Sequence, residues 1–356
     1  MKVGLIGRQA SGKTTIFNAL TGLHAPSGQG EKMESHLGVT KVPDARVDQL
    51  SSIFKPKKTT YAEIRFTDFP ATQSQEKLKA NAALRQAQGG EHSRTSLLAQ
   101  MRDVDAMALV LGDFDGSSEP MKELRDLLAE MILADLGVVE NRLSRLKKEK
   151  GKEREGEVLA RCLKALEGEE SLRALDFTAD EETLLSGFGF LSRKSVIAIF
   201  NVAEERAGKE LPDAYKAELD KLKIAGLCLS AKVEMEVAQL DEKDRQAFLA
   251  ELGIAEPARD RFIRSSYALL DLISFFTTGE DEVKAWTITR GTAARKAAGK
   301  IHSDIERGFI RAEVVAYEDF IRCGSEAKCR ETGKLRLEGK DYSVQDGDIV
   351  HFRFNV

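Results

Sequence analysis

Short apolar runs alternate with helical patterns through the first two thirds of the chain. Residues 2–6 (KVGLI) are rich in β-branched side chains and stop at a glycine, which is typical of a buried strand. The runs 105–114, 194–201 and 225–232 have the same character, whereas 61–69 alternates polar and apolar residues like a half-buried strand near a sheet edge. Strands separated by helices predict an α/β fold with a mostly parallel sheet.

The segment 120–191 interrupts this alternation with a long, highly charged stretch. Between residues 124 and 146 its apolar side chains recur three or four positions apart, so one helical face is apolar and the other is charged. We expect a helical hairpin that turns near 149–157. A solvated helix pair with a purely structural seam is one interpretation, and a protruding docking arm is the other.

The C-terminal part of the chain changes character again. We expect a strand at 282–288, a short helix within 293–309, and two strands within 341–356 joined by the turn residues QDGD. Two strands flanking a helix, together with a closing hairpin, indicate a small ubiquitin-like β-grasp module.

The composition is that of an ordinary globular protein. The 356 residues are 42% hydrophobic and 31% charged, and 54 Lys+Arg against 58 Asp+Glu give a net charge of -4, which does not indicate a nucleic-acid binder. Because Cys162, Cys228, Cys323 and Cys329 show no CxxC spacing, neither a zinc site nor a disulfide framework is expected. No apolar run approaches the length of a membrane span. We therefore expect a soluble cytoplasmic monomer with no membrane partner.

One motif carries specific chemistry. Gly7, Gly12, Lys13 and Thr14 match G-x-x-x-x-G-K-[ST], between the strand at 2–6 and a helical pattern that ends at a glycine. Such a loop curls backbone N–H groups around a phosphate, while its lysine contacts phosphate oxygens and its hydroxyl residue contacts Mg²⁺. The predicted phosphate-binding residues are Gly7, Gln9, Ala10, Ser11, Gly12, Lys13, Thr14 and Thr15.

The identity of the base is expected to be read by loops after later strands, because ligands bind beyond the carboxyl ends of parallel strands. The candidate residues are Asn201, Val202 and Glu204 in NVAEE, and Ser230, Ala231 and Lys232 in SAK. Glu204 takes the place of the aspartate in the guanine-reading N-K-x-D motif, and the longer side chain weakens the guanine interpretation. Alternatively, Asn201 caps the following helix and Glu204 is simply a solvated carboxylate.

The chain resembles the YchF, or Obg-like ATPase, family of translation-factor-class P-loop proteins from residue 1 to residue 356. The resemblance rests on GRQASGKTTIFNALTG, VPDARVDQL, NVAEE, LDEKDRQAFLAELGI, FFTTGEDEVKAWTI, AAGKIHSDIERGFIRAEVVAYEDFI and GKLRLEGKDYSVQDGDIVHFRFNV. It implies a G-domain formed by 1–119 and 192–275, an inserted helical hairpin or coiled coil at 120–191, and a C-terminal TGS β-grasp domain at 276–356. It also implies that ATP binds at least as well as GTP, through the N-x-x-E residues Asn201 and Glu204, with slow hydrolysis and ribosome association.

The residues that would control hydrolysis depart from the family pattern. Lys32 falls about where a metal-binding switch threonine is expected, and DFPA at 68–71 replaces the D-x-x-G element. Asp68 retains the carboxylate for Mg²⁺, but Ala71 behind Pro70 is less permissive than glycine for a switching backbone. We therefore expect Lys13, Asp68 and Mg²⁺ to carry what catalysis there is.

A water-activating residue is not evident. His92 lies in the segment where the family's catalytic histidine falls, although simple alignment places that position nearer Gln88. A lone loop histidine is more often just a solvated side chain.

RNA contacts are expected at the hairpin and the C-terminal module. The basic residues of that module are Lys284, Arg290, Arg295, Lys296, Lys300, Arg307 and Arg311. Arg295, Lys296 and Lys300 are spaced for one side of a helix, whereas interleaved acidic residues favour an ordinary mixed surface.

Three functions are consistent with these features. The first is a Mg²⁺-dependent purine nucleotide-binding protein, a slow ATPase or GTPase that favours ATP and acts at the ribosome. The second is an adaptor with degenerate switches that binds ATP or GTP structurally. The third is a nucleotide or metabolite kinase, which lacks an evident arginine-rich lid and leaves the C-terminal module unexplained.

Overall fold

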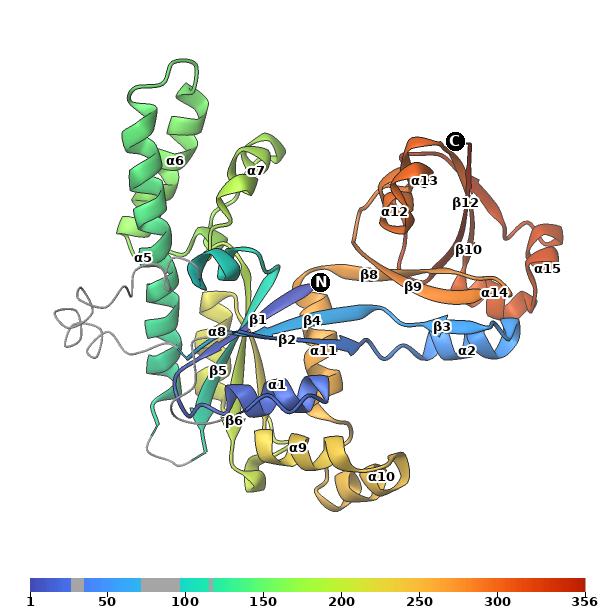
Figure 1. Ribbon diagram of the computed structural model, residues 1–356, viewed down its shortest axis with the longest axis horizontal. Coiled ribbons are helices and arrows are strands. Elements are labelled where there is room, and N and C mark those ends of the chain that lie inside the picture. Colours follow the sequence, from blue (N-terminus) through green and yellow to red (C-terminus); the bar gives the residue numbers. More distant parts are fainter. Residues whose placement is uncertain (27–34, 72–96, 115–117, 356) are drawn as a thin grey trace. The chain divides into compact units, whose positions relative to one another are not determined.

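The computed structural model describes residues 1–26, 35–71, 97–114 and 118–355, which form two compact units. The first unit, Lys2–Val39 with Arg65–Phe262, is built on a six-stranded sheet of order β2-β4-β1-β5-β6-β7 (Figure 1). The strands are β1 (Lys2–Gly7), β2 (His36–Lys41), β4 (Glu63–Asp68), β5 (Ala106–Asp113), β6 (Ser195–Val202) and β7 (Ala225–Leu229). Strands β4, β1, β5, β6 and β7 pair in parallel, so the predicted mostly parallel sheet is confirmed.

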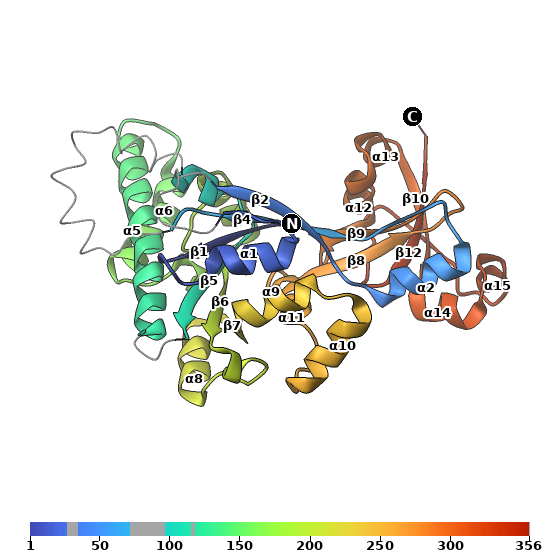
Figure 2. The ribbon, with the colours of Figure 1, turned by 60° about the horizontal axis from the view of Figure 1, so that its bottom comes forward.

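Helices cover both faces of this sheet (Figures 1 and 2). The helices between residues 13 and 269, apart from α2 described below, are α1 (Lys13–Thr21), α5 (Pro120–Leu146), α6 (Glu153–Glu167), α7 (Ala179–Leu185), α8 (Asp213–Leu222), α9 (Ala231–Gln239), α10 (Glu242–Glu251) and α11 (Ala258–Leu269). On one face, Leu127 of α5 and Leu219 of α8 pack in a core with Leu109 of β5. On the other, Phe66 of β4 lies 5.7 Å from Phe262 of α11, measured between ring centroids.

The predicted helical hairpin is confirmed as α5 and α6, and the chain turns between Leu146 and Glu153. Val139 of α5 and Leu159 of α6 are fully buried in a core of the hairpin's own. Asp135 anchors α5, because its buried carboxylate accepts the N–H groups of Leu191 and Ser192 at 3.0 and 2.7 Å. No helix within the described ranges is long and apolar enough to cross a membrane.

The second unit comprises Thr40–Ile64 and Ile263–Val356, with Met1. Its sheet has the order β11-β10-β12-β8-β9-β3. The strands are β3 (Lys58–Thr60), β8 (Leu272–Thr277), β9 (Glu282–Thr289), β10 (Phe309–Ala316), β11 (Arg336–Glu338) and β12 (Asp348–Phe354). The helices are α2 (Ala45–Phe54), α12 (Ala294–Ile301), α13 (Ser303–Arg307), α14 (Tyr317–Cys323) and α15 (Glu326–Glu331). Phe275, Ile288, Ala297 and Val350 lie in its core.

The segment 40–64 lies in a different place from the one that the sequence predicts. The sequence assigns it to the G-domain, but β3 pairs in parallel with β9 of the C-terminal sheet, from Lys58 opposite Glu282 to Thr60 opposite Lys284. Helix α2 is held there as well, because the Arg46 guanidinium lies 5.0 Å from the ring centroid of Phe276 and 2.9 Å from the Asp346 carboxylate. Strand pairing and these long-range contacts are tertiary interactions, which local sequence patterns do not reveal.

Two further predictions for the C-terminal part need correction. The helix within 293–309 is divided into α12 and α13 at His302, whose backbone is extended (φ -160°) and whose imidazole accepts the N–H of Asp304. The predicted closing hairpin is wrong, because only 348–354 forms a strand. The Asp348 carboxylate instead accepts Tyr342 O–H at 2.7 Å and Gln345 N–H at 2.8 Å, which folds the preceding residues into a turn.

Candidate nucleotide-binding site

The phosphate-loop motif joins β1 to α1, as the sequence predicts. Gly7 ends the strand and Lys13 begins the helix. Between them Ala10 and Gly12 have left-handed backbone conformations, with φ of 65° and 84°. Left-handed residues in such a loop turn successive N–H groups toward one side, and the N-terminus of α1 adds its positive dipole end. The loop therefore presents an anion-binding concavity.

Close packing around the loop explains both of its glycines. A Cβ atom at Gly12 would collide with the side-chain nitrogen of Asn201, and one at Gly7 would lie 2.6 Å from the carbonyl oxygen of Val110.

The hydroxyl of Ser11 is buried and has no hydrogen-bond partner among the described residues. A donor without a partner in an anion-binding loop fits a phosphate group.

Lys13, Thr14 and Asp68 converge at the end of β4. The ammonium group of Lys13 forms an ion pair with one carboxylate oxygen of Asp68, and Thr14 Oγ1 donates to the other at 2.9 Å. The side chains of Lys13 and Asp68 are only 7% and 2% exposed, so this ion pair is shielded from solvent. Because Mg²⁺ prefers oxygen ligands, the hydroxyl of Thr14 and the carboxylate of Asp68 form a suitable pair of ligands beside the phosphate loop.

Asn201 connects two of the predicted loops. Its side-chain nitrogen donates to the carbonyl oxygen of Ser11 at 2.9 Å, and its side-chain oxygen accepts the N–H of Ala231 at 2.9 Å. The residue is 5% exposed. Both polar atoms of Asn201 therefore hold the phosphate loop and the SAK loop together, and the alternative role as a cap of the following helix is wrong.

Glu204 and Lys232 form an ion pair between the two loops that the sequence predicts to read the base. Both side chains are partly exposed, and the hydrogen bond from Lys232 to Glu204 raises the pKa of the lysine. Glu204 is thus an exposed carboxylate that is paired with a lysine, rather than one that only water contacts.

The other predicted residues differ in their accessibility. Gln9 and Ala10 are exposed and Thr15 is half-buried. Val202 and Ser230 are 2% and 3% exposed, and Val202 belongs to the core beneath the sheet. Lys32, Gln88 and His92 lie outside the described residues.

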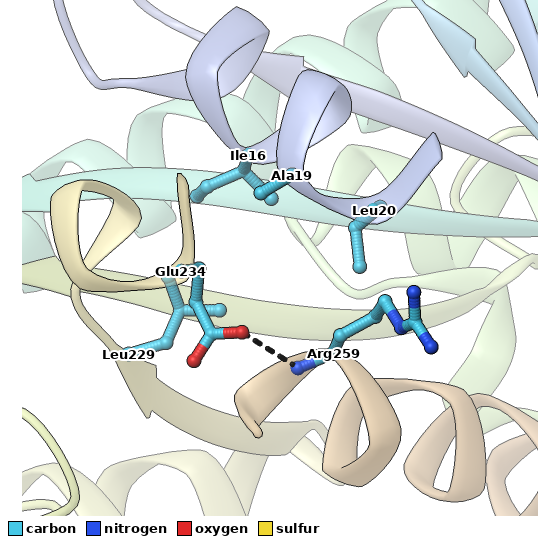
Figure 3. A pocket seen from close by; sticks show the side chains of 6 residues that line it. All are labelled: Ile16, Ala19, Leu20, Leu229, Glu234 and Arg259. Atoms are coloured by element: carbon cyan, nitrogen blue, oxygen red, sulfur yellow. Dashed lines mark hydrogen bonds between the residues drawn. The ribbon is translucent and has the colours of Figure 1, made fainter. Parts of the chain in front are cut away.

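A small cavity lies next to α1 but does not have the size of a nucleotide site. Its lining consists of Ile16, Ala19, Leu20, Leu229, Glu234 and Arg259 (Figure 3). The Glu234 carboxylate accepts the N–H groups of Ala258 and Arg259 at 2.8 and 3.2 Å, which caps α11. The free volume of about 10 Å³ holds at most a single water molecule, so this cavity is not a nucleotide site.

Most basic side chains predicted to contact RNA have partners within the C-terminal unit. Lys296 lies 2.7 Å from Glu306, Arg290 lies 2.9 Å from Asp271, and Arg307 pairs with Asp304. Arg295 donates to the carbonyl of Glu306 at 3.1 Å, and the Lys284 ammonium lies 3.8 Å from the ring centroid of Trp286. These contacts favour the mixed charged surface over a basic stripe.

The sequence gives no indication of one contact at the phosphate loop. The main-chain N–H of Arg8 donates to Glu123 at 3.3 Å, and the Arg8 guanidinium lies 2.6 Å from the Asp126 carboxylate. Both partners belong to α5, more than a hundred positions away. Glu123 and Asp126 are three positions apart, which places them on the same side of a helix, but this spacing does not identify Arg8 as their partner.

A parallel sheet with a phosphate loop after β1, and a carboxylate after β4 that meets the loop's lysine and threonine, defines a P-loop nucleotide-binding protein. Comparisons agree with this class. The family described as 50S ribosome-binding GTPase matches residues 2–142, and the C-terminal domain of YchF GTPases, described as a protein of unknown function, matches residues 272–355.

Full-length relatives narrow the class to a family. The chain is 37% identical to the Bacillus subtilis ribosome-binding ATPase YchF over 100% of both chains, and 38% identical to the Pasteurella multocida protein of the same name over 100% of this chain and 99% of that one. The Schizosaccharomyces pombe YchF GTPase structure matches with a TM-score of 0.80 at 26% identity, covering 99% of this chain and 97% of the other. The chain belongs to the YchF family.

Proposed function

We propose that this protein binds a purine nucleoside triphosphate with Mg²⁺, prefers ATP to GTP, hydrolyses it slowly, and acts at the ribosome. The observation that carries the proposal is the convergence of Lys13, Thr14 and Asp68 beside a loop with two left-handed residues. We also expect the protein to be a cytoplasmic monomer, as the sequence indicates.

Each residue of the cluster has a distinct proposed role. The backbone N–H groups of the loop and the hydroxyl of Ser11 bind phosphate oxygens, and Lys13 exchanges its contact with Asp68 for the β- and γ-phosphates. Thr14 and Asp68 would hold the Mg²⁺. When bound, Mg²⁺ would supply neutralisation of the phosphate charge, which favours attack of water on a γ-phosphate.

The preference for ATP rests on Glu204. Guanine presents adjacent N1–H and N2–H donors that match a carboxylate, whereas adenine presents an acceptor at N1. The Glu204 carboxylate is engaged by Lys232, so it is less available to guanine than an unpaired aspartate is. Asn201 positions the phosphate loop and the SAK loop through its two side-chain hydrogen bonds. The main chain at Val202, Ser230 and Ala231 completes the base site.

Ribosome association is proposed from the names of the relatives, which are ribosome-binding ATPases over the full length of the chain. The C-terminal unit, with a mixed sheet packed against α12, has the order of elements expected for a TGS-type β-grasp domain. This unit and the hairpin of α5 and α6 are the surfaces that we propose for ribosome or RNA contact.

An adaptor that binds nucleotide without switching is the second candidate. The observation in its favour is the sequence after Asp68, where Pro70 precedes Ala71 in place of a glycine. A proline fixes the backbone at the point where a switch has to move, and alanine is less permissive than glycine.

Calorimetric titration with ATP, GTP, ADP and a non-hydrolysable ATP analogue, each with Mg²⁺, tests these proposals. We expect ATP and its analogue to bind more tightly than GTP and ADP. Equal affinities for ATP and ADP leave no free-energy difference to drive a conformational change and favour the adaptor. Tighter binding of GTP than of ATP contradicts the proposed role of Glu204.

A further inference from the structure

Arg8 contacts the inserted hairpin from within the phosphate loop. It follows Gly7 directly, and both its main chain and its side chain bind acidic residues on the first turns of α5. The Arg8 N–H donates to Glu123 at 3.3 Å, and its guanidinium lies 2.6 Å from Asp126. We refer to Arg8, Glu123 and Asp126 as the loop clamp.

The loop clamp is partly shielded from solvent. The side chains of Arg8 and Asp126 are 26% and 43% exposed, and the Nε atom of Arg8 is buried without a hydrogen-bond partner among the described residues. Burial raises the pKa of Glu123. Charges in such surroundings interact more strongly than fully solvated ones, so an added charge nearby perturbs them measurably.

Helix α5 connects the clamp to the rest of the hairpin. Leu124 and Leu127, which alternate with the clamp residues along the helix, are buried in the core of the sheet. The same helix continues to Leu146, and its distal half packs with α6. A change at the clamp therefore acts on the helix that supports the hairpin.

We propose that Arg8 is a positioning residue that couples nucleotide binding to the hairpin. In the free protein, the clamp holds the first turns of α5 against the phosphate loop. A bound triphosphate brings negative charge beside the loop, which attracts the Arg8 guanidinium and repels the carboxylates of Glu123 and Asp126. Nucleotide binding thus loosens the base of α5, and any partner that fixes the hairpin changes nucleotide affinity in return.

Hydrogen exchange and calorimetry on the full chain test the coupling. In the wild-type protein, the ATP analogue with Mg²⁺ should increase the exchange rate of α5 amides by about fivefold or more. In Asp126→Asn, α5 should exchange faster without nucleotide and respond little to it, and the analogue should bind more tightly by a similar factor. Glu123→Gln should shift the α5 exchange rate and the affinity for the analogue in the same direction as Asp126→Asn. Asp126→Glu keeps the carboxylate, so both quantities should stay at their wild-type values.

Glu218→Gln is the matched control. Glu218 on α8 lies 2.7 Å from Arg125 of α5, so this substitution breaks an ion pair of the same helix that does not involve the phosphate loop. If Asp126→Asn matches Glu218→Gln in affinity and keeps the wild-type exchange response, the coupling is overturned. Weaker binding by Asp126→Asn overturns it too, because the clamp is then only a brace for the loop. The inference rests on nucleotide binding, so a wild-type protein that binds no nucleotide overturns the proposed function together with it.

Discussion

The side-chain nitrogen of Asn201 donates a hydrogen bond of 2.9 Å to the carbonyl oxygen of Ser11, across 190 positions of sequence. The side-chain oxygen of the same residue accepts the N–H of Ala231. One buried amide therefore fixes the phosphate loop relative to the loop after β7. Asn201 therefore joins two loops of the candidate nucleotide site.

Asn201→Ala removes both hydrogen bonds and leaves the Ser11 carbonyl and the Ala231 N–H without their partner. We expect the free energy of unfolding to fall by about 2 kcal/mol, and nucleotide affinity to fall by about tenfold because the loops are no longer fixed. Denaturant unfolding and calorimetry measure these effects. The control is Asn141→Ala on the exposed side of α5, which should change stability by less than about 0.5 kcal/mol. Equal effects of the two substitutions would contradict the role of Asn201.

Lys13→Ala should weaken binding of the Mg²⁺–ATP complex by at least about tenfold, because the loop loses its cation for the phosphate oxygens. Calorimetric titration is the measurement. Lys2→Ala is a suitable control, since Lys2, at the start of β1, forms an exposed ion pair with Asp103. Unchanged affinity in Lys13→Ala would remove the basis for a phosphate-binding loop.

Lys232→Met frees the carboxylate of Glu204. We expect the ratio of GTP to ATP affinity to rise by about fivefold, because the carboxylate becomes available to the guanine donors and repels the acceptor of adenine. Competition titrations with the two nucleotides measure the ratio. Lys216→Met breaks another exposed lysine–glutamate pair, with Glu210, and should leave the ratio unchanged. The same ratio in both variants would mean that Glu204 does not read the base.

The second unit should lose stability in alkaline solution through Tyr342. Burial, followed by the hydrogen bond to Asp348, raises the pKa of Tyr342 to about 12, against about 10 for tyrosine in an unfolded chain. A folded-state pKa above the unfolded value gives a contribution that is fully present below about pH 10 and is lost as the pH rises to about 12.

Tyr342→Phe tests this dependence. Near neutral pH it should destabilise the protein by about 1 kcal/mol, because buried Asp348 loses a hydrogen bond. Above pH 10 the difference from the wild-type protein should shrink. Urea unfolding at a series of pH values supplies the comparison, and a difference that stays constant up to pH 12 would argue against a raised tyrosine pKa.

The parts of this fold that could be predicted are those determined by local sequence. The glycines and lysine of the loop, the apolar runs of β1, β5, β6 and β7, and the spacing of leucines along α5 each reflect a short-range requirement. The partners of the predicted residues could not be predicted. The contacts of Asn201 with Ser11 and of Arg8 with Asp126 join residues 190 and 118 positions apart, which no local pattern reveals.

The errors in the C-terminal part have a similar origin. The residues 341–344 have an alternating pattern suited to a strand, but the carboxylate of Asp348 satisfies donors at Tyr342 and Gln345 and makes a turn instead. Local side-chain hydrogen bonds thus compete successfully with strand pairing. The docking of 40–64 depends on Arg46 meeting Phe276 and Asp346 from far along the chain.

The position of β3 has a practical consequence for dissecting this protein into fragments. A fragment that starts at residue 276 lacks β3, α2 and most of β8, so the N–H and C=O groups of β9 along Glu282–Lys284 become a bare sheet edge. Such edges pair readily with other chains, and the fragment should self-associate. The remaining chain, residues 1–275, would in turn carry α2 without Phe276 beneath it. The two units are interleaved in sequence, and neither can be obtained intact by a single cut.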